Sequence, residues 1–113
     1  MSQSLKEIVY NNIISSFYKS TRTNYSDTMG ETYYLFPNNK SAIFSSLKQD
    51  SQSDRLSGYI NTKNLTSLGI NLTLDNQDAL CENGNGIKLH KLSDDELTYI
   101  NTFLIPQCNR LRN

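Results

Sequence analysis

Cys81, Lys88 and His90 are the residues whose types and spacing come nearest to a reactive group. They lie on either side of Asn83-Gly84-Asn85-Gly86, which supplies the positive-φ positions that a tight hairpin turn needs. Side chains alternate between the two faces of a strand, so both plausible turn registers place Cys81 on the same face as Lys88 and His90. A thiol beside a cation and an imidazole could ionise readily and act as a nucleophile.

Catalysis by Cys81 would also need an oxyanion site and a group that orients His90, and the sequence offers no recognisable one. We therefore interpret Cys81 as a small strand residue and His90 as a solvated one. A small enzyme or nucleotide-binding protein that uses these two residues remains a further alternative.

Other polar motifs have simpler structural explanations. Cys81, His90 and Cys108 match no zinc spacing, and Asp75-Asn76-Gln77-Asp78 lacks the glycine and late Glu of a calcium loop. The glycine-containing turn at 83–86 precedes a strand pattern and not a helix, unlike a phosphate-binding loop. Asp94-Asp95-Glu96 follows a helix cap, where acidic residues stabilise the helix dipole. We expect no metal and no cofactor.

Tyrosine is the more informative surface residue. The chain has seven Tyr and no Trp, set among many Ser and Asn residues, a composition that resembles a binding paratope. Tyr10 lies off the apolar stripe of its helix, and Tyr34 points away from Tyr33 in a predicted strand. A codon bias that enriches Tyr together with Asn and Ile explains the same composition. We predict that the partner-binding residues are Tyr10, Tyr34, Lys88 and His90.

Two helices are predicted at the ends of the chain. Ser4 and Glu7 form a capping pattern before an apolar stripe, which predicts a helix over residues 5–18 that frays through 19–23. Ser93 and Glu96 form a second capping pattern, and Leu92 can pack on Leu97 as a hydrophobic staple. Pro106 disfavours helical conformation at Ile105, so the second helix should end or kink there.

The middle of the chain predicts short elements. Strands are expected over 32–36, 70–74, 79–82 and 87–92, with Tyr59-Ile60 weakly extended. Asn38 or Asn39 would cap a short helix carrying Ile43, Phe44 and Leu47, and Gly69 would close a helical turn at Leu65–Leu68. The predicted fold is α+β: N- and C-terminal helices packed on a small three- to four-stranded antiparallel sheet, as a single domain over residues 1–113.

Charge and composition narrow the function classes. Eleven basic residues balance eleven acidic ones, which argues against a dedicated nucleic-acid protein. The first residues lack the build of a signal peptide and no apolar run approaches membrane-spanning length, so we expect a cytosolic protein with free thiols at Cys81 and Cys108. Residues with A/T-rich codons dominate, as in many bacteria, their phages and several protists.

Together these observations predict a small non-catalytic binding protein that occupies or blocks a surface of a larger protein partner. Small phage or mobile-element proteins that inhibit host enzymes or defence systems offer an analogy. The alternative from a different class is a structural subunit of a large assembly such as a virion.

Overall fold

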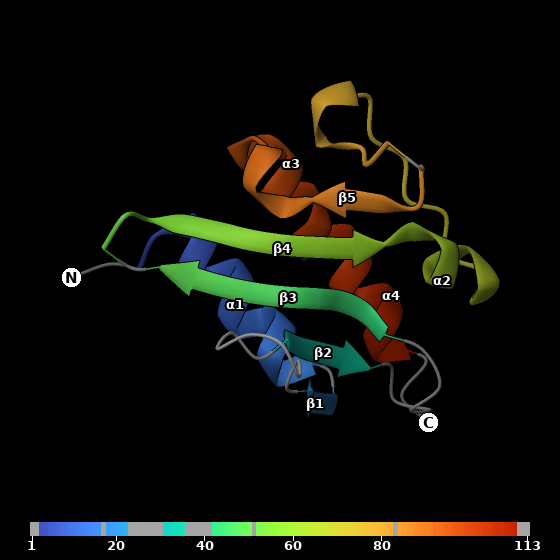
Figure 1. Cartoon of the computed structure of the whole chain (residues 1–113), viewed down its shortest axis with the longest axis horizontal. Coiled ribbons are helices and arrows are strands. Elements are labelled where there is room, and N and C mark those ends of the chain that lie inside the picture. Colours follow the sequence, from blue (N-terminus) through green and yellow to red (C-terminus); the bar gives the residue numbers. More distant parts are fainter. Residues whose placement is uncertain are drawn as a thin grey trace.

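The sheet and the terminal helices form two layers. A computed structural model describes residues 3–16, 18–22, 31–35, 42–50, 52–82 and 84–110, with the backbone alone for 18–22, 31–35 and 42. Within these residues, five antiparallel strands each pair with their sequence neighbours: β1 (Tyr18–Arg22), β2 (Glu31–Leu35), β3 (Ala42–Asp50), β4 (Arg55–Asn61) and β5 (Gly86–Lys88). The helix α1 (Leu5–Ser16) and the C-terminal helix lie behind this sheet in Figure 1. The predicted α+β fold, with terminal helices packed on a small antiparallel sheet, is confirmed.

The N-terminal helix begins as predicted but ends earlier. The Ser4 hydroxyl accepts a hydrogen bond from the Glu7 N–H at 3.2 Å, and Val9 and Ile13 are fully buried. The helix ends at Ser16, and the expected extension to residue 18 is wrong because β1 begins at Tyr18 and pairs with β2. Residues 18–22 have only weak helix propensity, and pairing with β2 stabilises them as a strand instead.

The C-terminal helix is the element whose local signals agree best with the structure. It consists of α3 (Asp94–Tyr99), a π-helical segment (Ile100–Leu104) and α4 (Ile105–Arg110). Ser93 and Glu96 form the predicted capping box. The Glu96 N–H donates to the Ser93 hydroxyl at 3.2 Å, and the Ser93 N–H donates to the Glu96 carboxylate at 2.8 Å. The helix does not end at Pro106, which lacks a backbone N–H. The π segment ends two residues before this proline, and the Ile105 N–H donates to the Ile100 carbonyl.

Strand β3 replaces the short helix predicted around Ile43, Phe44 and Leu47. Its register with β4 shifts between Ser45 and Lys48, so two residues of β3 stand opposite Gly58. This β-bulge buries both Phe44 and Leu47 on the core side, and their three-residue spacing imitates a helix. The predicted caps Asn38 and Asn39 lie outside the described residues.

The predicted meander of strands 70–74, 79–82 and 87–92 is wrong. Burial alternates along 70–74, but the segment joins no ladder, since it lies against the core as an extended loop. A 3₁₀ turn at Gln77–Ala79 follows, and Leu80 contributes a single bridge to Ile87. β5 stops at Lys88, where a second 3₁₀ turn, Leu89–Lys91, begins.

The other short elements agree with the sequence patterns. The strand predicted at 32–36 is β2, and the extended Tyr59-Ile60 pair belongs to β4. The predicted helical turn is α2 (Thr62–Ser67), capped by the Asn61 side chain. It closes with a Schellman motif, in which Gly69 adopts a φ of +82° and the Ile70 N–H donates to the Leu65 carbonyl at 3.0 Å.

Gly58 provides a test of the bulge. Its φ is +130°, and a Cβ added there would meet the Leu47 Cα and the Ser45 carbonyl oxygen at 3.0 Å each. We expect Gly58→Ala to lower the free energy of unfolding by about 3 kcal/mol, because backbone strain and a backbone clash add. Gly69→Ala, with no atom within 4 Å of its added Cβ, should cost about 1 kcal/mol. Urea denaturation of both variants checks this, and equal losses would contradict the bulge geometry.

Candidate functional site

The hairpin between residues 80 and 87 fixes where Cys81 lies. The Cys81 N–H donates to the Gly86 carbonyl at 2.9 Å, and the Gly84 N–H donates to the Cys81 carbonyl at 2.8 Å. Leu80 bridges to Ile87, which is one of the two predicted registers. Ile87 is buried on the core side, so Cys81, one residue from Leu80, belongs to the opposite face.

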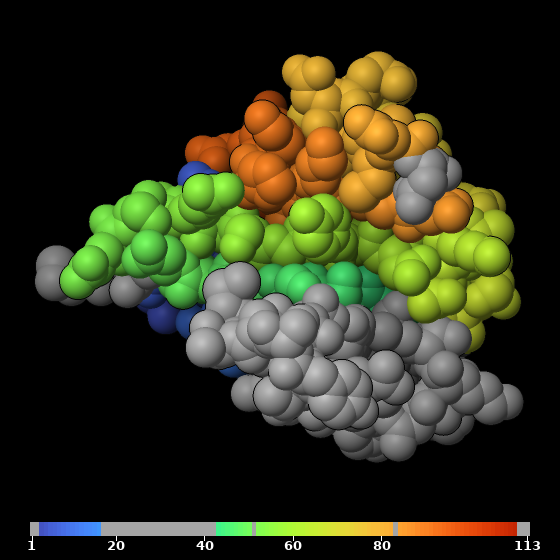
Figure 2. Space-filling model, viewed as in Figure 1, coloured from blue at the N-terminus to red at the C-terminus, as the bar shows by residue number. Residues whose placement is uncertain are grey.

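That opposite face of β3, β4 and β5 carries a cross-strand row of side chains. Ser45, Tyr59 and Lys88 are register partners on three adjacent strands. Tyr59 is 42% exposed, one of two large exposed hydrophobic residues in the described part of the chain. We call this uncovered side, centred on Tyr59, the outer face; Figure 2 looks onto it, with the atoms of β4 between those of β3 and β5.

Cys81 and His90 share the outer face but not a site. Cys81 lines a hollow of about 190 Å³ with Asn61 and Gly86. His90 lines another of about 240 Å³, together with Ser57 and residues further along β3 and β4. Tyr59 borders both hollows and separates them along β4. The structure therefore does not bring the thiol and the imidazole together as a nucleophile and its base.

The hollow at His90 is rich in cations and hydroxyl groups. Its lining residues, besides His90, are Ser46, Lys48, Arg55, Ser57, Gly58 and Tyr59. Partial desolvation is the main cause that lowers the pKa of the His90 imidazole, and the positive charges of Arg55, Lys91 and Lys88 lower it further. Positive charge from three neighbouring segments thus converges on one exposed histidine.

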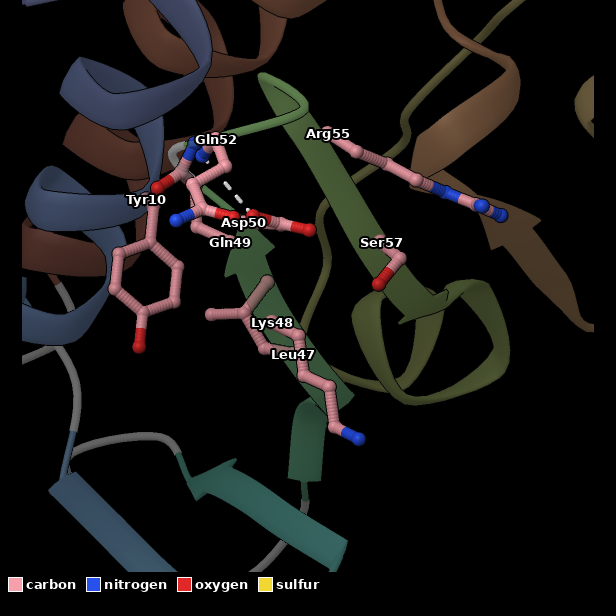
Figure 3. Close-up of a pocket in the computed structure, with 8 residues that line it drawn as sticks. All are labelled: Tyr10, Leu47, Lys48, Gln49, Asp50, Gln52, Arg55 and Ser57. Carbon is pink, nitrogen blue, oxygen red and sulfur yellow. Dashed lines mark hydrogen bonds between the residues drawn. The ribbon is translucent and has the colours of Figure 1, made fainter.

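A third hollow, larger than these two, lies at the end of the β3–β4 hairpin. It measures about 680 Å³ and includes Tyr10 from α1 together with Gln49 and Asp50. Figure 3 shows the Tyr10 ring on one side of β3 and the Arg55 side chain pointing to the other, so the polar groups do not converge on one point. The Nε2 atom of Gln49 is buried here without a hydrogen-bond partner among the described residues.

The four predicted partner-binding residues are therefore scattered. Lys88 and His90 lie on the outer face, whereas Tyr10 is a half-buried residue of α1 that lines the hollow at the β3–β4 hairpin. The backbone register pairs Tyr34 with Phe44, and the Tyr34 side chain lies outside the described part. Sequence reasoning missed Tyr59 and Arg55. Had residues 55–61 been predicted as a strand, the apolar Leu56 and Ile60 would have marked its buried face. Arg55 and Tyr59 would then have been expected on the exposed face.

The acidic cluster Asp94-Asp95-Glu96 has the structural role predicted for it. The Glu96 carboxylate accepts the Ser93 N–H and the Asn76 side-chain amide, which ties the 70–79 loop to the helix. These hydrogen bonds, led by that of the Ser93 backbone, lower the pKa of Glu96. Across the described ranges, no group of three or more His, Cys, Asp or Glu side chains is placed to hold a metal ion.

Comparison with known proteins gives no match: no protein family, no curated protein and no solved structure is similar to this chain at a significant level. Among the described helices, none has the length and apolar content to cross a membrane.

The two cysteines, both free thiols, should react very differently. Cys108 is 1% exposed, and burial raises the pKa of its thiol to about 12, whereas Cys81 is only partly buried. We expect iodoacetamide at pH 8 to modify Cys81 in the folded protein and Cys108 at least about a hundredfold more slowly.

Peptide mass spectrometry before and after unfolding in urea measures this difference. Equal rates in the folded state would contradict the packing of Cys108. An abnormally fast reaction of Cys81 near pH 6 would support the nucleophile hypothesis.

Proposed function

We propose that the protein is a small non-catalytic binding protein that occupies a surface of a larger protein partner through the outer face. The observation that carries the proposal is Tyr59, exposed at the centre of three strands on the side away from the helices. Tyr supplies a large, rigid contact area at low cost in side-chain entropy.

The surroundings of Tyr59 support the same proposal. Its neighbours on the outer face are small polar or cationic: Ser45, Ser57, Asn61, Asn85 and Lys88. A central aromatic residue surrounded by polar groups is typical of interfaces in which few residues supply most of the binding energy. The separation of Cys81 from His90 also favours binding over nucleophilic catalysis.

Affinity purification from lysates of candidate host cells tests the proposal, with Tyr59→Ser as the test variant. Ile8→Ser is the matched control, because Ile8 is 38% exposed, is the other large exposed hydrophobic residue described, and lies on α1. We expect a stoichiometric partner that binds the wild type and Ile8→Ser, and that binds Tyr59→Ser at least about tenfold more weakly.

Failure to recover a stoichiometric partner from any candidate host would count against a binding function. A partner lost equally from both variants would place the interface elsewhere than the outer face.

A further inference from the structure

We propose that the hollow bordered by Tyr59 and His90 is a carboxylate-binding site, and that the partner presents an acidic segment to it. This inference rests on the proposed binding function and names the chemistry of the partner surface. It adds two residues, Arg55 and Tyr59, to those expected from the sequence.

The lining of the hollow has the chemistry of a carboxylate-binding site. Arg55 supplies a guanidinium cation, His90 supplies an imidazole that becomes cationic when it is protonated, and hydroxyl groups come from Ser57 and Tyr59. None of the residues that line this hollow is acidic. A guanidinium can bind a carboxylate through two parallel hydrogen bonds, and nearby hydroxyl groups can donate to its remaining lone pairs.

The backbone that forms the hollow has an unusual conformation. Ser46 and Gly58 both line it, and both have positive φ, +53° and +130° respectively. Positive φ is unusual for serine, and it occurs here because the β-bulge places an extra residue in β3. Strained backbone and bulges are frequent beside functional sites, where they redirect side chains.

Three basic residues of the outer face form no ion pair with the nearby acidic groups that the structure describes. Asp54 forms an ion pair with Lys6 at 3.8 Å. The Asp50 carboxylate accepts the Gln52 N–H at 3.0 Å in the hairpin turn. Within the described residues, no carboxylate forms an ion pair with Arg55, Lys88 or His90. The positive charges of Arg55 and Lys88, and that of His90 when it is protonated, are therefore available to an external anion.

The size and setting of the hollow favour a protein carboxylate over a nucleic acid. A volume of about 240 Å³ accommodates a side-chain carboxylate, and the formal net charge of the chain is +0. Nucleic-acid binding requires several phosphate contacts along an extended basic surface. The exposed Tyr59 ring beside the cations suits a partner surface with acidic and apolar side chains together.

A titration of His90 with an octaglutamate peptide tests the inference, because His90 is the single histidine of the chain and its NMR signals are unambiguous. Without peptide, its pKa should lie below the ordinary value of 6.5. Bound carboxylates favour the imidazolium, so saturating peptide should raise this pKa. By linkage, the peptide should bind more tightly as pH falls from about 7.5 to about 5.5.

Two matched variants locate the effect. Arg55→Gln should weaken octaglutamate binding about fivefold or more, whereas Arg110→Gln, an exposed arginine on α4, should leave it unchanged. His90→Gln should abolish the pH dependence of binding. Inorganic phosphate and a single-stranded oligonucleotide serve as competing probes.

Several results would overturn the inference: an unchanged His90 pKa with peptide, equal weakening by the two arginine variants, or tighter binding of phosphate or the oligonucleotide than of octaglutamate. These outcomes need no host partner. A captured partner lost from Tyr59→Ser, with no octaglutamate response, would refute the carboxylate site alone. An octaglutamate response without any host partner would support the site and count against the proposed function.

Discussion

The contact between the β3 backbone and Gly58 of β4 is the constraint on which the rest of the structure depends. Two residues of β3, Ser46 and Leu47, stand opposite this one glycine, and the space for a Cβ at Gly58 is filled by β3 backbone atoms. The extra residue reverses the alternation of side chains along β3. Without it, burial of Phe44 would place Lys48 in the core and Leu47 outside.

Both faces of the sheet follow from this reversal. On the inner face, Leu47 joins Phe44 and Ile60 under α1 and the C-terminal helix, which encloses one continuous core. On the outer face, Lys48 is exposed, and the bulge leaves a hollow between it, Tyr59 and His90. The same local irregularity that permits close packing thus builds the surface that we propose for binding. Comparable devices in other proteins re-aim side chains next to functional sites.

Local signals predicted the ends of the chain well and its middle poorly. The side-chain cap at Ser4, the capping box at Ser93 and the glycine cap at Gly69 depend on residues within one or two helical turns, so the sequence suffices. The bulge depends on pairing between β3 and β4. It leaves the buried residues Ile43, Phe44 and Leu47 at a spacing in the sequence that is also found on one face of a helix. The alternation of side chains along a strand predicted the correct face for Lys88 and His90. Arg55 and Tyr59 were missed because residues 55–61 were not predicted to form a strand.

The register of β3 against β4 is the most direct test of this account, and nuclear Overhauser effects between backbone protons of the two strands measure it. The account predicts cross-strand contacts for Ser45 with Tyr59 and for Lys48 with Ser57, together with a set of backbone coupling constants at Ser46 that agrees only with positive φ. A continuous register, in which Ser46 pairs with Gly58 and Leu47 with Ser57, would contradict it. Such a result would remove both the hollow and the basis for the proposed carboxylate site.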